Sequence, residues 1–319
     1  MSLFVKKTID QLMNEAGDSE KGLKRTLGAG SLVALGIGAI IGAGLFVRTA
    51  AAAAQNAGPS VTIGFIVAAI GCALAGLCYA ELSSSIPISG SAYTYTYATM
   101  GELLAWVIGW DLILEYAVGA ATVGIAWSEY LNNLLTNVLH WKAIPYEWCH
   151  SPFESLKDAA GNVVAHGIIN IPAFGIIALL SLLLIKGTKE SAFVNGIIVI
   201  TKVAIVIMII VLGWGFINST NHTPYIPAPS TYVDSQNIGH NYGGILGVLG
   251  AAGVVFFAFI GFDAVSTAAQ EAKNPEKTMP IGILGSLAIC TVLYVLFAHV
   301  LTGIATVDDF RTNGKEASI

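Results

Sequence analysis

Charge is scarce in this sequence, and its scarcity indicates the class of protein. Lysine, arginine, aspartate and glutamate make up 11% of the 319 residues, against about 25% in an ordinary soluble domain. Hydrophobic residues make up 55% of the chain, and the mean hydropathy is +0.72. A soluble domain is therefore excluded, and we expect an integral membrane protein.

Several common kinds of site are also missing. No basic cluster is interleaved with aromatic residues, so nothing points to a nucleic-acid partner. The four cysteines lack paired spacing and no HExxH-like pattern occurs, so we expect no disulfide framework, metal ion or cofactor. Residues 1–26 are polar and basic, unlike a cleavable signal peptide. We expect them to form a cytoplasmic N-terminal arm.

Apolar runs of about 20 residues, the length of a membrane-spanning helix, recur along the chain. They predict an all-α protein with seven spans and no strands. Lysine and arginine are denser in the arm and in the loops on its side, which predicts a multi-pass protein of the cell membrane with a cytoplasmic N-terminus. The predicted spans are residues 28–54, 61–83, 101–129, 167–185, 193–217, 243–270 and 281–304.

The first span contains the stretch GIGAIIGAGLF, residues 36–46, in which glycine is unusually frequent. Its glycines are Gly36, Gly38, Gly42 and Gly44. Each costs about 1 kcal/mol in a helix interior relative to alanine, so the helix can open here. An opening would expose carbonyls near Ile40 and amides near Ala43 and Gly44, a pair of ends suited to a zwitterion. Close helix packing explains such glycines equally well.

The sixth span repeats this signal. Its centre reads GVVFFAFIGFD, from Gly253 to Asp263, and places a glycine and an acid inside an apolar helix. Two glycine-interrupted helices in corresponding positions indicate a secondary transporter built from inverted repeats.

The motifs GAIIGAGLF, PISGSAY, FFAFIGFD and EAKNPEKTMP occur in this order along the chain. Together they resemble the amino acid/polyamine/organocation superfamily of permeases. The run GELLAWVIGWDLILEY and Lys202 resemble the bacterial relatives of the cationic amino acid transporters within it. The resemblance implies a broken-helix fold of two inverted five-helix repeats.

The same resemblance divides the chain. It implies a first five-helix repeat at 27–217, an extracytoplasmic loop at 218–241, and the first two helices of the second repeat at 242–305. Residues 306–319 would form an extracytoplasmic tail. The second repeat is incomplete, and the ending TNGKEASI has no helix stop and looks cut short.

The family's substrate site can be transferred motif by motif. The resemblance implies that the substrate carboxylate meets the amides of Ala43 and Gly44, and that its amino group meets the carbonyls of Ile40, Phe257 and Ile260. This agrees with the preference of helix N-termini for anions and of C-termini for cations.

Three residues near the second break are candidates for gating. Phe257 or Phe259 would be the aromatic gate, although packing against lipid or core explains either ring equally well. Asp263 follows the break, where helix capping and gating are compatible roles.

Two ionisable residues inside predicted spans are candidates for proton coupling. An ammonium at the bilayer centre costs about 2.5–3.5 kcal/mol on insertion scales and normally faces a partner or cavity. The resemblance implies that Lys202 fills the position that a sodium ion takes in sodium-dependent relatives. Glu115 is its natural acidic partner, although a purely structural pairing of Glu115 with tyrosine or backbone groups is the alternative.

We therefore expect a permease, not an enzyme, that moves neutral or cationic L-amino acids through the lipid bilayer by alternating access with a proton, as a symporter. One alternative is a non-transporting fragment or half-transporter that binds a partner. A seven-helix receptor or retinal protein is a weaker alternative, because the N-terminus is expected inside and the seventh span has no lysine. The preferred amino acid and the oligomeric state stay open.

Overall fold

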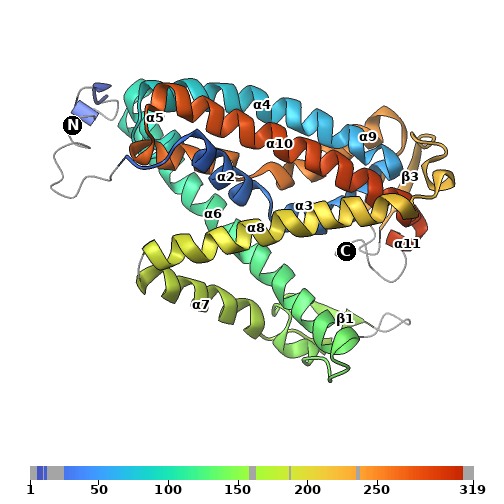
Figure 1. Cartoon of the computed structure of the whole chain (residues 1–319). Helices are drawn as coiled ribbons and strands as arrows, with labels where there is room; N and C mark the ends of the chain where they lie inside the picture. The colour runs from blue at the N-terminus through green and yellow to red at the C-terminus, as the bar shows by residue number, and fades with distance from the viewer. Residues whose placement is uncertain are drawn as a thin grey trace. The chain divides into compact units, whose positions relative to one another are not determined.

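The computed structural model describes residues 6–9, 11–12, 25–157, 163–186, 188–234 and 238–311, and it is predominantly helical (Figure 1). The α-helices are α2 (Ala29–Ile40), α3 (Ala43–Ala52), α4 (Val61–Ser85), α5 (Ser91–Thr99), α6 (Glu102–Asn133), α7 (Ile171–Lys186), α8 (Thr188–Gly213), α9 (Gly244–Phe256), α10 (Pro275–Ile304) and α11 (Val307–Arg311). The π-helical turns are η1 (Ala53–Ala57) and η3 (Leu134–Val138). The 3-10 segments are η2 (Gly58–Ser60), η4 (Tyr146–Trp148), η5 (Trp214–Phe216), η6 (Ser219–His222), η7 (Phe257–Phe259) and η8 (Phe262–Glu271).

All seven predicted spans contain helix, which confirms the prediction of a helical membrane protein. Two of them, Ala29–Ile40 and Ile171–Ile185, are shorter apolar helices. Among the described residues, five helical stretches are long and apolar enough to cross a membrane: Gly44–Ser85, Glu102–Val138, Gly196–Phe216, Gly244–Glu271 and Pro275–Ile304.

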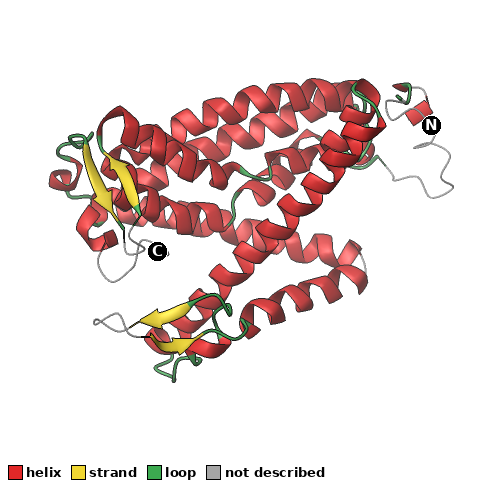
Figure 2. Cartoon of the chain, turned by 180° about the vertical axis from the view of Figure 1, so that it is seen from behind, coloured by secondary structure: helices red, strands yellow, loops and turns green. Residues whose placement is uncertain are grey.

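The expectation that the chain has no strands is wrong. Two antiparallel hairpins lie in its polar loops (Figure 2): β1 (Ser155–Lys157) pairs with β2 (Val163–His166), and β3 (Ser230–Val233) pairs with β4 (Gly239–Tyr242). These strands have three or four residues each. Segments so short in a polar loop have no buried face, so they show no alternation of apolar and polar residues that would reveal them.

The chain forms two compact units, one made of residues 1–110 and 196–319 and the other of residues 111–195. Asn170 organises part of the second unit just before α7. Its side-chain amide donates to the carbonyl of Cys149, and its oxygen accepts from the amide of Ala173 at 3.1 Å. Both interruptions of apolar helices described below lie in the first unit.

Helix α10 is the scaffold of the first unit, because it packs along both α4 and α2 (Figure 1). The contact with α2 depends on a small residue. A Cβ added at Gly282 would lie 2.8 Å from the Cβ of Leu32, closer than real side chains approach. The core around these helices is closely packed, and its largest fully buried side chains include Phe65, Phe259, Met279, Ile283, Tyr294 and Phe297.

Candidate functional site

The first predicted span is interrupted at the predicted place. Helix α2 ends at Ile40, and Ile41 and Gly42 adopt extended backbone before α3 begins at Ala43. The carbonyls at the end of α2 and the first amides of α3 therefore have no partners within their own helices. The N-cap of α3 is Gly42, which has no side chain that could accept from these amides. The amides of Ala43 and Gly44 thus lie at the positive end of the α3 dipole.

The sixth predicted span is interrupted too. After η7, Ile260 is extended, and Gly261 has a φ of +105° before η8 begins. A left-handed residue of this kind favours glycine. A Cβ at Gly261 would also lie 2.8 Å from the carbonyl oxygen of Ala39. The second interruption therefore lies directly against the end of α2.

The two interruptions also touch at the start of α3. A Cβ added at Gly44 would lie 2.5 Å from the Cα of Ala258 and 3.1 Å from the carbonyl oxygen of Phe257. Only glycine allows this approach of two backbones. Backbone amides and carbonyls at the ends of helical segments from two distant parts of the sequence are thereby brought into one place.

The sequence left two interpretations of the glycines in the first span, close helix packing and an opening of the helix. Each interpretation applies to some of them. A Cβ at Gly36 would collide with the Ser286 side chain, and one at Gly38 would collide with Val199. These two glycines serve helix packing. Gly42 lies in the interruption itself, and Gly44 lies where the second interruption approaches it.

Lys202 reaches the open end of α2. Its ammonium donates to the carbonyl oxygens of Gly38 and Ile41, each at 2.6 Å. A cation at the C-terminal end of a helix is favoured by the helix dipole and satisfies carbonyls that the helix leaves open. Lys202 therefore occupies a position where carbonyl oxygens converge on one cation.

Tyr294 on α10 is part of the same cluster, and the sequence analysis missed it. Its hydroxyl lies 2.8 Å from the carbonyl oxygen of Ile40 and 3.0 Å from that of Ala258. The available signal was a tyrosine inside an apolar helix, because a buried tyrosine hydroxyl usually has a hydrogen-bond partner. The sequence does not indicate which carbonyls it meets.

The two candidate gate residues have different surroundings. Phe259 is fully buried, and its ring packs edge-on against Phe65 with a centroid distance of 6.2 Å. Phe257 is only partly buried, and the guanidinium of Arg48 lies 5.6 Å from its ring centroid. Phe259 is therefore a core residue, whereas Phe257 is partly exposed, and its role as a gate stays a prediction.

The remaining candidates are less well defined. Asp263 is buried in the first turn of η8, where a carboxylate interacts favourably with the helix dipole. Ile260 provides a carbonyl at the second interruption. Glu115 lies on α6 in the second unit, whereas Lys202 belongs to the first. Their pairing stays a prediction.

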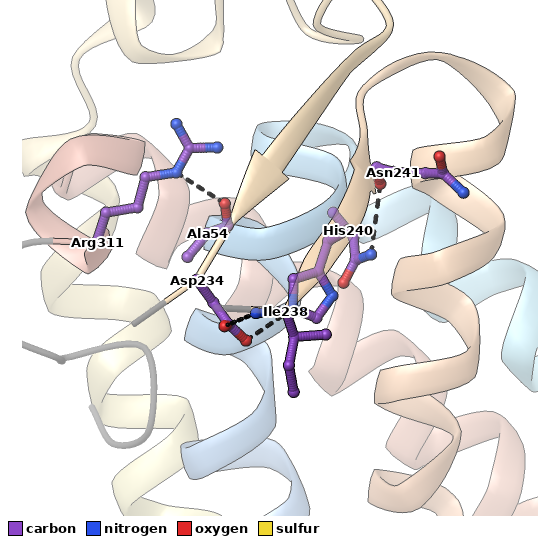
Figure 3. A network of polar contacts seen from close by, with 7 residues as sticks. Ala54, Asp234, Ile238, His240, Asn241 and Arg311 are labelled. Carbon is purple, nitrogen blue, oxygen red and sulfur yellow. Dashed lines mark hydrogen bonds and ion pairs between the residues drawn. The ribbon is translucent and has the colours of Figure 1, made fainter. Parts of the chain in front are cut away.

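The far end of the first broken helix is held by a polar network (Figure 3). The Nε of Arg311 donates to the carbonyl of Ala54 in η1 at 2.9 Å, and its guanidinium lies 4.1 and 4.4 Å from the rings of Tyr232 and Tyr242. The β3–β4 hairpin is closed by His240, whose Nε2 lies 2.8 Å from a carboxylate oxygen of Asp234. The hairpin is thus attached to the segment that continues α3.

Comparison with known proteins gives a consistent result. A family model described as "Amino acid permease" matches residues 27–318. The chain is 45% identical over 303 residues to the methylthioribose transporter of Bacillus subtilis (strain 168), covering 95% of this chain and 59% of that protein. It is 45% identical over 304 residues to the branched-chain amino acid permease BcaP of the same organism, covering 95% and 60%.

A plant relative is more distant. The chain is 40% identical over 289 residues to cationic amino acid transporter 9, chloroplastic, of Arabidopsis thaliana, covering 90% of this chain and 46% of that protein. The chain thus spans about 60% of the length of the two bacterial relatives.

Proposed function

Because this chain belongs to the amino acid permease family, we propose that it contains the substrate site of a transporter that moves L-amino acids across the cell membrane by alternating access. The observation that supports this most directly is the contact between the two helix interruptions at Gly44 and Ala258. The contact gathers backbone amides and carbonyls at helix ends, and these two kinds of group are complementary to a carboxylate and an ammonium.

In this proposal the substrate carboxylate binds the amides of Ala43 and Gly44, and its ammonium binds the carbonyls of Ile40, Phe257 and Ile260. Phe257 covers the bound substrate, and Asp263 contributes to gating. Main-chain groups recognise the part that all amino acids share, so neutral and cationic side chains are both accommodated. This fits the names of the relatives, which include a branched-chain amino acid permease and cationic amino acid transporters.

We assign proton coupling to Lys202. Its ammonium bridges two carbonyls at the end of α2, so loss of its proton would weaken its hold on the opening of the first broken helix. A proton that leaves and returns during the cycle would then couple proton movement to amino acid transport. Glu115 is the proposed acidic partner. The N-terminus faces the cytoplasm in this proposal.

A different substrate class is the second candidate, because one of the relatives is named a methylthioribose transporter. Methylthioribose has neither the carboxylate nor the ammonium that would use the paired helix ends. A third candidate is a half-transporter that binds substrate or a partner without transport, which is consistent with the fraction of each relative's length that the chain spans. The seven-helix receptor has no support from the family match.

One experiment separates these candidates. The full chain is reconstituted in liposomes, and uptake of labelled L-leucine, L-arginine and methylthioribose is measured with and without an inward proton gradient, beside empty liposomes. Stereospecific, gradient-stimulated uptake of an amino acid supports the proposal. Saturable amino acid binding in detergent without uptake supports the half-transporter. Uptake of methylthioribose that no amino acid inhibits overturns the assigned substrate class.

A further inference from the structure

We propose that the hydroxyl of Tyr294 takes the place of the substrate's ammonium at the carbonyls of Ile40 and Ala258 whenever the site is empty. This inference rests on the proposed function, since it concerns the same pair of helix interruptions. It assigns to a residue on α10 a role in the return of the empty transporter.

The first argument is the position of the hydroxyl. It lies 2.8 Å from the carbonyl oxygen of Ile40, at the end of α2, and 3.0 Å from that of Ala258, in the second interruption. In sequence Tyr294 lies 254 residues from Ile40 and 36 residues from Ala258. Its side chain therefore joins two interruptions that are far apart along the chain. Ile40 is also one of the carbonyls that we assign to the substrate.

The second argument is the number of protons. A tyrosine hydroxyl has one proton to donate, whereas an ammonium has three. Two carbonyl oxygens within hydrogen-bond distance of one hydroxyl cannot both be satisfied by it at the same time. One of these two carbonyl oxygens therefore lacks a proton from this hydroxyl at any moment. An arriving ammonium supplies the missing protons.

The third argument is the charge of the neighbouring donors. Lys202 already satisfies the carbonyls of Gly38 and Ile41 with a cation, so a second cation at those oxygens would be repelled. The carbonyl of Ile40 is paired with a neutral donor instead. At this oxygen a substrate ammonium would therefore share or replace a neutral donor, and it would leave Lys202 on its own two carbonyls.

The fourth argument is that the ring cannot easily leave. Tyr294 is fully buried, and its ring centroid lies 5.5 Å from that of Phe65 and 5.2 Å from that of Phe259. Its hydroxyl stays beside both interruptions, and only its O–H bond needs to rotate. Tyr294 is thus a positioning residue of the empty state.

The test uses two replacements that change the number of protons in opposite directions. Tyr294→Phe keeps the ring and provides no proton. Incorporation of 4-aminophenylalanine at position 294 keeps the ring and provides two protons. Thr291→Val is the matched control, because it removes a hydroxyl one turn away on α10 that donates only to Leu287 of the same helix at 2.7 Å.

Affinity for L-leucine is measured on the purified full chain in detergent, together with the melting temperature of the substrate-free protein. We expect the phenylalanine variant to melt at a lower temperature and to bind leucine up to about tenfold more tightly, since an interaction of about 1.4 kcal/mol corresponds to a factor of ten. The aminophenylalanine variant should melt at the same or a higher temperature and bind several-fold more weakly. The control should leave affinity unchanged.

Transport gives a second readout, because a merely structural role of Tyr294 would slow net uptake and exchange alike. In liposomes, Tyr294→Phe should slow net uptake, which requires the empty protein to return, and leave leucine–leucine exchange near the wild-type rate. The inference would be overturned if Tyr294→Phe slowed net uptake and exchange equally. It would also be overturned if the affinities of the two variants did not move in opposite directions. In either case, amino acid binding by the wild-type protein would still support the proposed function. Wild-type protein that binds no amino acid would remove the proposed function and, with it, this inference.

Discussion

The ammonium of Lys202 lies 2.6 Å from the carbonyl oxygen of Ile41, at the point where the first broken helix opens. The residues are 161 positions apart in sequence. Lys202 also donates to Gly38, so one side chain of α8 caps the end of α2. The hydrogen bonds of Lys202 therefore help to hold the end of α2 where the first broken helix is interrupted.

Replacing Lys202 with alanine should abolish gradient-stimulated uptake of amino acid. The change removes a charged donor from two carbonyls, and a buried acceptor left without a partner costs about 1–3 kcal/mol. Uptake into liposomes with and without a proton gradient measures the effect, and Lys277→Ala, at an exposed position, is the control. A Lys202→Ala protein that still accumulates substrate under the gradient contradicts the assignment.

Replacing Gly44 with alanine should separate the two interruptions. The new Cβ would fall 2.5 Å from the Cα of Ala258, and overpacking of this kind typically costs about 1–3 kcal/mol. We expect a lower melting temperature and loss of amino acid binding. Gly30→Ala is the matched control, since a Cβ there meets nothing within 4 Å and alanine favours helix. Unchanged binding by Gly44→Ala would argue against a substrate site at this contact.

The two phenylalanines of the second interruption should respond differently to truncation. Phe259→Ala creates a cavity beside Phe65 and Tyr294, with an expected loss of stability of about 3–5 kcal/mol. Phe257→Ala should change the melting temperature little but lower the affinity for substrate. Thermal unfolding and binding measured on both variants test this division. The assignment of Phe257 as a gate fails if its truncation affects stability alone.

The Arg311 network should require arginine specifically. Lysine at this position keeps the charge but loses the planar group that stacks against Tyr232 and Tyr242. We expect Arg311→Lys to destabilise the attachment of the hairpin to Ala54 by about 1–2 kcal/mol, seen as faster hydrogen exchange in η1. Arg25→Lys, at an exposed position, should leave that exchange unchanged, and equal rates in both variants would contradict the prediction.

The segment around η6 should loosen in acid. Burial and the neighbouring His299 lower the pKa of His222 below its ordinary value, which is about 6.5. His222 also faces Tyr225 and the hydroxyl of Thr302. The unfolded segment binds the proton more readily, so the stabilisation is complete above about pH 6.5 and is lost as the pH falls toward the lowered pKa.

A shift from pH 7.5 to pH 5.5 should therefore lower the melting temperature of the wild-type protein more than that of His222→Gln. The measurement is thermal unfolding across this range. Parallel pH profiles for the two proteins would exclude His222 as the source of the effect.

The sequence by itself determined the helical membrane class, the family resemblance and the two interruptions, because these depend on local properties. In lipid, long apolar runs must form helices that satisfy their own backbone hydrogen bonds. The glycines around Ile40 and at Gly261 weaken a helix whatever its tertiary contacts are. Lys202 stood out for a similar local reason, since a charge inside an apolar helix is costly without a partner.

Only the tertiary structure decided which groups meet. It separated Gly36 and Gly38, which pack against neighbouring helices, from Gly44, which allows contact between the interruptions. It buried Phe259 in the core and brought Tyr294 to two carbonyls. Such relationships depend on the approach of backbones far apart in sequence, and no spacing of residues along one helix encodes them.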